Sequence, residues 1–354
     1  MRVLIVGAGA IGTCVGVSLA HQGQEVVFLL RSAPSVTYIR AHGMRLVKED
    51  GTELRLPHPV VTQSPEEALQ HGPYDVAILA LKTYHTDTFL ESITPFQREF
   101  PPVLCLQNGV EAEGKLTRVL GADRVLAGSV TTAVSRRAVG DATVERQRGI
   151  GIAKGHPLAT ALFVAFQDAE LVPRLYQNAA AMKWSKLLTN LLGNATSAIL
   201  DMSPAEIFTH PGLAHLEIVQ LREALAVMDA LHLPVVDLPG VRVRALAWGA
   251  KHLPLWVARP ILRKAVGGGR GGKMPSFHID LYGGRGRTEV DALHGAVARF
   301  GRRLRVPTPT NQMLAGTLEA LTRAEIPLDA FRHNPDALLT VWEAAIKAVP
   351  RASL

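Results

Sequence analysis

The chain has few cysteines, few aromatic residues and no long hydrophobic run. Its 354 residues include two cysteines, Cys14 and Cys105, too few for the disulfide framework of a secreted domain. Each lies in an apolar run, so we expect both to be buried and the protein to be cytoplasmic. Aromatic residues make up 5% of the chain, which argues against a stacking surface for single-stranded nucleic acid. No apolar run approaches the ~20 residues that span a bilayer.

Acidic residues are missing from residues 242–273, which carry eight lysines and arginines. The rest of the chain has 30 basic and 31 acidic residues, so the formal net charge of +7 is a local feature. We therefore expect neither nucleic acid nor a membrane as a partner. Pro254 and Pro260 interrupt the amphipathic face that an interfacial helix would need around Trp248 and Trp256. This segment is expected to pack on a helical domain, line a subunit contact or draw anions toward a cleft.

A glycine-rich turn follows the first predicted strand, residues 2–6. Its spacing is G-x-G-x-x-G, and a helical pattern follows it, which is the context that a dinucleotide-binding turn requires. Gly7 permits the tight turn, Gly9 lets a pyrophosphate approach the backbone, and Gly12 allows close packing of helix and strand. The helix N-terminus supplies N–H groups for the phosphates. The predicted cofactor contacts of this turn are Gly7, Ala8, Gly9, Ala10, Ile11 and Gly12.

The second predicted strand, residues 25–30, indicates which dinucleotide binds. Arg31 follows it, where an NAD-preferring site would have Asp or Glu for the ribose 2′-hydroxyl. An arginine can bind a 2′-phosphate, so the sequence favours NADP (NADPH) over NAD. The alternative is an exposed arginine at a strand end.

Two more predicted strands, residues 74–81 and 103–106, end at polar residues. Lys82 follows the first strand, and Asn108 comes shortly after the second. The carboxyl ends of parallel strands meet at one edge of a sheet, where ligands bind. A role for both residues at the cofactor or substrate is therefore expected, although Asn-Gly is also a common turn dipeptide.

The pattern along the chain predicts an α/β protein with two domains. Short β-rich pieces at residues 125–130, 142–146 and 150–153 are expected to form the far edge of the same sheet. After Tyr176 almost everything has a helical period. We predict a Rossmann-type NADP-binding domain over residues 1–175 and an all-helical substrate and dimerisation domain over residues 176–354, with the glycine-rich run 267–272 as a loop or hinge.

One predicted helix of the second half carries an unusual polar stripe. Lys186, Asn190 and Asn194 are spaced at i, i+4 and i+8, within an arc of about 80°, among leucines that favour burial. A buried amide without a partner costs roughly 1–3 kcal/mol, so a polar group must meet this stripe. That group belongs either to a neighbouring helix or to a ligand.

A later segment adds a serine and a glutamate. Ser276 opens a short helical stretch, and residues 288–291 open another helix with Thr288 as N-cap and Asp291 at the capping-box position. Glu289 would then lie in the first turn, where the helix dipole favours its charge. That structural role is the alternative to a catalytic one.

Together these residues resemble the ketopantoate reductases (2-dehydropantoate 2-reductases) over nearly the whole chain. The motifs are the glycine turn, Leu81-Lys82, Gln107-Asn108-Gly109, the helix Trp184-x-Lys186-x-x-x-Asn190-x-x-x-Asn194, Pro275-Ser276, and Thr288-Glu289-Val290-Asp291 with Gly295. The glycine turn is shared with many dehydrogenases, whereas the lysine–asparagine helix combined with the serine and glutamate is specific. The resemblance implies a Rossmann domain followed by an all-helical domain, with the active site in the cleft between them.

The resemblance also implies roles for individual residues. Lys186 would act on the ketone as a general acid, and Glu289 would support the hydroxyl end of the substrate. The residues implied to hold the substrate are Asn108, Asn190, Asn194 and Ser276. The residues implied to contact the cofactor beyond the glycine turn are Arg31 at the 2′-phosphate and Lys82, Asn108 and Glu289. No metal is expected.

The expected function is NADPH-dependent reduction of ketopantoate to (R)-pantoate, in pantothenate and coenzyme A biosynthesis. Hydride transfer to a ketone carbon leaves negative charge on oxygen, which an ammonium can stabilise and protonate; such help is typically worth ~10²–10⁴ in rate. The alternatives are a reductase of another branched 2-oxo acid and a non-enzymatic NADPH-binding sensor. A homodimer is left open. The run Phe277 to Asp280 departs from the family, and we expect His278 to have a packing or cleft-wall role rather than to serve as a second acid.

Overall fold

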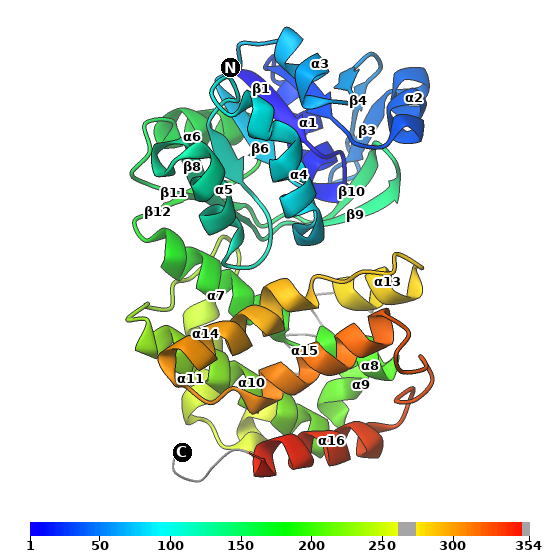
Figure 1. Cartoon of the computed structure of the whole chain (residues 1–354), viewed down its shortest axis with the longest axis vertical. Helices are drawn as coiled ribbons and strands as arrows, with labels where there is room; N and C mark the ends of the chain where they lie inside the picture. The colour runs from blue at the N-terminus through cyan, green and yellow to red at the C-terminus, as the bar shows by residue number, and fades with distance from the viewer. Residues whose placement is uncertain (261–273, 349–354) are drawn as a thin grey trace. The chain divides into compact units, whose positions relative to one another are not determined.

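The structure is a computed structural model that describes residues 1–260 and 274–348. The chain divides into two compact units, Met1–Lys183 with Asp237–Val241, and Trp184–Val236 with Arg242–Leu354 (Figure 1). The predicted loop 267–272 and the end of the basic segment lie outside the described residues. Within the described ranges, no helix has the length and hydrophobicity that a membrane crossing requires.

The first unit is built on an eight-stranded sheet of order β12-β11-β8-β7-β6-β1-β2-β5. Its strands are β1 (Arg2–Val6), β2 (Glu25–Leu29), β5 (Val60–Thr62), β6 (Val76–Leu79), β7 (Val103–Cys105), β8 (Val125–Val130), β11 (Ile150–Ala153) and β12 (Pro173–Tyr176). All neighbours pair in parallel except β8 and β11. The chain winds outward from β1 in both directions, as the predicted Rossmann topology requires.

Helices cover both faces of this sheet. The helices of the first unit are α1 (Ala10–His21), α2 (Ala33–His42), α3 (Pro65–Gln70), α4 (Thr86–Ile93), α5 (Ala112–Leu120) and α6 (Ala159–Asp168), with 3₁₀ turns η1 (Thr83–His85), η2 (Thr94–Phe96) and η3 (Ala122–Arg124). Residues of α1 and α6 pack in one core cluster, and residues of α3, α4 and α5 pack in another.

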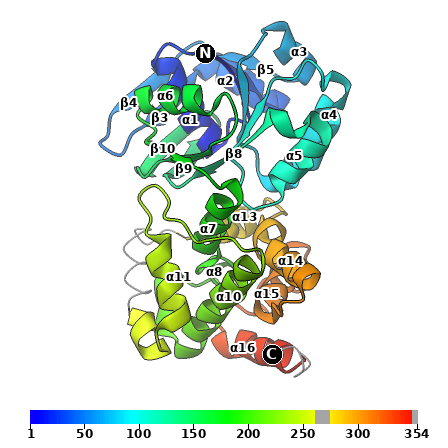
Figure 2. The same ribbon diagram turned by 90° about the vertical axis from the view of Figure 1, so that its left-hand side faces the viewer.

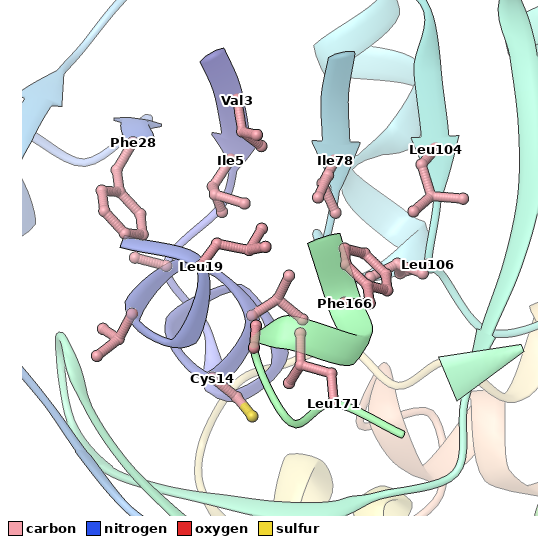
Figure 3. Packing of buried hydrophobic residues seen from close by; sticks show 14 of the residues in the cluster. Val3, Ile5, Cys14, Leu19, Phe28, Ile78, Leu104, Leu106, Phe166 and Leu171 are labelled. Carbon is pink, nitrogen blue, oxygen red and sulfur yellow. The ribbon is translucent and has the colours of Figure 1, made fainter. Parts of the chain in front are cut away.

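The strand β1 shows how the sequence produces these two cores. Val3 and Ile5 belong to the cluster with α1, whereas Leu4 and Val6 belong to the opposite cluster, because successive side chains of a strand point to opposite faces. Figure 3 shows Val3 and Ile5 facing the α1 side with Phe28 and Phe166. The cysteines Cys14 and Cys105 are buried, one in each cluster, as predicted.

One predicted part of the sheet is wrong. Residues 142–146 belong to β10 (Asp141–Arg146), which lies in a separate four-stranded sheet of order β4-β3-β10-β9. The other strands of this sheet are β3 (Met44–Val47), β4 (Glu53–Leu56) and β9 (Ala133–Ala138). β10 pairs in parallel with β3, almost a hundred residues earlier, and its buried Ala142 and Val144 join the core under α1. A local strand pattern does not specify such a distant partner.

The described elements of the second unit are all helical, as predicted. Its elements are α7 (Ala179–Leu191), whose first residues belong to the first unit, α8 (Ala195–Leu200), α9 (Pro204–Thr209), α10 (Pro211–Ala230), α11 (Val243–His252), α13 (Ser276–Tyr282), the π-helical turn η4 (Asp291–Gly295), α14 (Ala296–Leu304), α15 (Pro309–Thr322) and α16 (Pro335–Lys347). The long helix α10 packs against α9, α11, α14, α15 and α16 and runs through the middle of the unit (Figure 2).

Candidate functional site

The glycine turn lies where the strand order reverses, at the end of β1 between β2 and β6. Gly7 has φ +98°. A Cβ at Gly12 would lie 1.7 Å from the carbonyl oxygen of Gly7, so only glycine lets α1 pass this close. A Cβ at Gly9 would meet no atom within 4 Å, which leaves that side of the turn open. Gly9 is the N-cap of α1, and no described side chain caps this helix end. The turn therefore offers backbone N–H groups to a phosphate.

Arg31 lies two residues after the end of β2, where the Leu29 carbonyl accepts a hydrogen bond from the Gly7 N–H of the turn. It is exposed, and its Nη1 donates to Nδ1 of His85 at 3.3 Å. His85 belongs to η1, which follows β6. Arg31 and His85 thus follow the two strands that flank β1, and they meet at the edge of the sheet where the cofactor is expected. No local sequence pattern marks His85, because its partner lies 54 residues away.

Lys82 and Asn108 lie at the same edge of the sheet. They follow the paired residues Leu79 of β6 and Cys105 of β7 by three positions each. Gln107 ties the two segments together, since its Nε2 donates to the carbonyl of Leu81 at 3.0 Å and its Oε1 accepts from Oγ1 of Thr86 at 3.1 Å. The predicted meeting of these strand ends is thus reproduced.

A buried lysine that the sequence analysis did not select also lies at this edge. Nζ of Lys183 donates to the carbonyls of Gln107 at 2.6 Å and Gly128 at 3.3 Å, and it pairs with a carboxylate oxygen of Glu113 at 2.7 Å. Burial lowers the Lys183 pKa, but Glu113 outweighs this effect and the pKa is raised. Lys183 is therefore an ammonium at neutral pH. In the sequence, Lys183 stands next to Trp184 within a predicted helix, and this pattern does not indicate that the lysine is buried or which groups it binds.

The predicted polar stripe is interrupted in the second unit. Lys186 and Asn190 lie half-buried on α7, but this helix ends at Leu191 and α8 begins after Asn194. The break is at Gly193, which has φ +59°, a conformation that glycine adopts without steric cost. The expectation that Asn194 continues the same helical arc is therefore wrong.

Asn194 is buried, and its amide binds groups of the protein. Its Oδ1 accepts from the backbone N–H of Phe277 at 3.1 Å. Its Nδ2 donates to the carbonyl of Asn190 at 3.0 Å and to Oγ of Ser276 at 3.4 Å. Asn194 thus holds the end of α7 against the start of α13, and Ser276 itself is exposed there. Three of the predicted substrate residues are brought together in this way.

Glu289 is almost completely buried, at 2% exposure. The predicted capping box is wrong, because Val290 is the N-cap of η4 and makes no side-chain cap bond, while Asp291 pairs with Arg299. The chain enters α14 through the π-helical turn η4, a feature that is frequent at functional sites. Glu289 therefore precedes the helix N-cap and does not lie in the first turn, where its sequence pattern predicts it.

A buried hydrogen-bond network on α10 supports both of these segments. The carboxylate of Glu217 accepts from the backbone N–H of Gly193 at 2.8 Å, from Oγ1 of Thr196 at 2.6 Å and from Nε2 of Gln220 at 2.6 Å. Oε1 of Gln220 lies 2.9 Å from Nε2 of His294, in η4. Since a carboxylate only accepts, Gln220 must present its NH₂ to Glu217, and His294 must donate through Nε2.

His294 is fully buried, and burial lowers its pKa to about 3. The ring is therefore neutral at physiological pH. The network connects the break after α7 with the turn that follows Glu289, and the residues that form it are far apart in sequence. An amphipathic pattern marks α10 as a core helix but does not indicate which polar groups it carries inward.

His278 lies on α13 and binds another part of the same unit. Its Nε2 is 2.6 Å from Oδ1 of Asp201, and its ring stacks on Tyr282. Burial would raise the pKa of Asp201, but His278 and Arg332 outweigh it and lower the pKa. His278 is thus paired with a carboxylate, and the expected position in a cleft wall stays a prediction.

Comparisons with known proteins agree with these features. The family model described as ketopantoate reductase PanE/ApbA matches residues 3–155, and its C-terminal counterpart matches residues 178–322. A 2-dehydropantoate 2-reductase of Halobacterium salinarum is 28% identical over 332 residues, which cover 91% of this chain and 99% of that protein.

Solved structures show the same fold. A PanE/ApbA family ketopantoate reductase from Ralstonia eutropha has a TM-score of 0.76 at 24% identity, covering 92% of this chain and 99% of its own. A D-mandelate dehydrogenase with NADH and anilino(oxo)acetate has a TM-score of 0.73 at 20% identity, with the same coverage. The family models and relatives together span most of the chain. The protein is therefore an oxidoreductase of the ketopantoate reductase family.

Proposed function

We propose that the protein reduces ketopantoate to (R)-pantoate with NADPH. The observation that carries this proposal is the hydrogen bonding of Asn194, which assembles Asn190 and Ser276 in the helical unit one helical turn beyond Lys186. A lysine, an amide and a hydroxyl are the groups that a 2-oxo acid requires, because it presents a ketone and a carboxylate. The names of the relatives support the choice of ketopantoate.

The glycine turn Gly7–Gly12 would hold the pyrophosphate of the cofactor through backbone N–H groups, and Arg31 would bind the 2′-phosphate. NADPH, when bound, supplies the hydride. Lys186 donates a proton to the ketone oxygen and stabilises the charge that develops there, an effect typically worth ~10²–10⁴ in rate. Asn190 and Ser276 orient the carboxylate and hydroxyl of the substrate without competing for that proton.

Glu289, Asn108 and Lys82 complete the proposed site. The carboxylate of Glu289 would accept a hydrogen bond from the hydroxyl end of the substrate. Lys82 and Asn108, at the carboxyl ends of β6 and β7, would contact the reacting end of the cofactor. Asn194 would act mainly by fixing Ser276, since its amide already binds three protein groups.

A turnover screen tests this function. The protein is mixed with NADPH or NADH and one of several 2-oxo acids, including ketopantoate, branched aliphatic acids and phenylglyoxylate, and loss of reduced nicotinamide is followed. We expect ketopantoate with NADPH to give the highest kcat/KM. Faster turnover of another acid would assign the chain to a related 2-oxo acid reductase. Failure of every acid, with tight NADPH binding, would favour the non-enzymatic sensor.

The proposed cellular context is the cytoplasm, with a small-molecule 2-oxo acid as the binding partner. The two buried cysteines are consistent with a reducing compartment. The homodimer also stays a prediction, which light scattering on the purified protein would test.

A further inference from the structure

Lys183 is a buried charge with three defined partners. Only 5% of the residue is exposed, and its ammonium is directed at the Gln107 carbonyl, the Gly128 carbonyl and the Glu113 carboxylate. The two carbonyls accept hydrogen bonds from the ammonium, and the carboxylate forms an ion pair with it. Removing a charge from water costs several kcal/mol even after relaxation, and a methionine would fill similar space without that cost. Burial of this charge therefore calls for an explanation beyond packing.

The carbonyl that Lys183 holds most closely precedes Asn108. β7 ends at Cys105, three residues before Asn108, and the residue after Asn108, Gly109, has φ +81°. The turn lies beyond the paired residues of β7, so a donor from outside the sheet can help to fix it. The 2.6 Å bond from Nζ of Lys183 to the Gln107 carbonyl supplies this donor.

The same residue connects Lys183 to the second strand end. The side chain of Gln107 donates to the Leu81 carbonyl, directly before Lys82, and is itself held by Thr86 of α4. Lys183 therefore fixes the backbone of Gln107, and Gln107 fixes the chain before Lys82. This arrangement therefore holds the backbone directly before both residues proposed to contact the reacting end of the cofactor.

We propose that Lys183 is a positioning residue for the reaction, which sets Asn108 directly and Lys82 through Gln107. This inference rests on the proposed function, because Asn108 and Lys82 receive their roles there. Glu113 has a different role, which can be tested separately from that of Lys183. Its carboxylate balances the buried charge but does not touch Gln107 in the described contacts.

The two parts can be separated by three variants, Lys183→Met, Glu113→Gln and the double variant. Glu113→Gln leaves the Lys183 side chain and its bond to Gln107 in place, because even a neutral amine donates an N–H, so stability should fall while kcat stays within about threefold of wild type. Lys183→Met leaves the carboxylate of Glu113 without its cation, and both stability and kcat should fall. The double variant removes both charges, so its Tm should recover relative to Lys183→Met.

Turnover of the double variant decides the question. We expect its kcat to stay about 10–100-fold below wild type, since a misplacement of about 1 Å can cost about 100-fold, while its NADPH Kd, set mainly at the glycine turn, changes little. If kcat recovers together with Tm, Lys183 has only a structural role and the inference is wrong.

A second measurement does not depend on turnover. Amide hydrogen exchange at residues 108–110 should be faster in the double variant than in Glu113→Gln, because only the former lacks the bond to Gln107. Equal exchange would overturn the positioning role even if no 2-oxo acid were reduced. Absence of wild-type turnover with faster exchange in the double variant would refute the proposed function and leave the positioning of the turn intact.

Discussion

A methionine at position 186 would keep most of the length of the lysine side chain but lose the proton that the ketone oxygen needs. Lys186→Met should therefore lower kcat by at least about 100-fold, within the range for loss of a general acid. NADPH affinity should stay nearly unchanged, because the glycine turn Gly7–Gly12 is untouched. Steady-state kinetics and fluorescence titration with NADPH measure the two effects.

Lys251→Met is the matched control for this substitution. Lys251 lies on α11 and pairs with Asp229 on α10, and exposed pairs contribute little. Its kcat should equal that of wild type. If Lys186→Met instead loses NADPH affinity while its turnover is unchanged, Lys186 binds the cofactor and does not act on the substrate.

The charge of Arg31 should decide between the two nicotinamide cofactors. Replacement by Asp would repel a 2′-phosphate and offer an acceptor to a 2′-hydroxyl, so the preference for NADPH over NADH should narrow or reverse. The ratio of kcat/KM for the two cofactors measures it. Arg55→Asp, at another exposed arginine of the same unit, should leave the ratio unchanged, and an unchanged ratio in Arg31→Asp would refute the contact.

At the scale of single elements, the sequence predicted those helices, strands and turns that are determined by residues close together in the chain. The glycine turn after β1 could be recognised because its three glycines and both flanking elements lie within twenty residues. The break between α7 and α8 could not be recognised from the sequence, because a glycine within a helical pattern is compatible with a continuous helix. At the break the Gly193 N–H donates to the carboxylate of Glu217, 24 residues later, which the local pattern does not show.

The same reasoning applies to the candidate site. Lys186, Asn190, Ser276 and Glu289 could be selected by residue type and family resemblance. The roles of Lys183 and His294 could not, since each is defined by partners more than fifty residues away. Burial of polar groups is a property of the packed molecule, and a single sequence does not show it.

Glu217 should stabilise the junction between α7 and α8. In Glu217→Gln, an amide NH₂ would face donors that now share a carboxylate, so at least one buried donor loses its acceptor. We expect the free energy of unfolding in urea to fall by about 1–3 kcal/mol. Glu343→Gln on α16, whose side chain is exposed and pairs only with Lys347 in the described contacts, should change it by less than about 0.5 kcal/mol. Equal effects of the two variants would mean that the network contributes nothing specific.

At the scale of the whole molecule, stability must depend on the protonation of His294. Its pKa is about 3 in the folded protein and 6.5 in an unperturbed chain. Between these values the unfolded state binds a proton that the folded state does not. The free energy of unfolding must therefore fall as the pH is lowered from about 6.5 toward 3, and the full contribution of the neutral ring is present above 6.5.

This contribution can be isolated with His294→Gln, which keeps an N–H donor for Gln220 but does not titrate. Below pH 6.5, wild-type stability should fall with pH more steeply than that of the variant, by up to about 1.4 kcal/mol for each pH unit. Urea unfolding at a series of pH values measures both slopes, so an overall loss of stability from the changed side-chain volume does not affect the comparison. His58→Gln, at a histidine exposed to water, should keep the wild-type slope. If His294→Gln also keeps the wild-type slope, the His294 ring is not buried as a neutral group. The proton between His294 and Gln220, in the network that joins α10 to η4, would then have to be assigned differently.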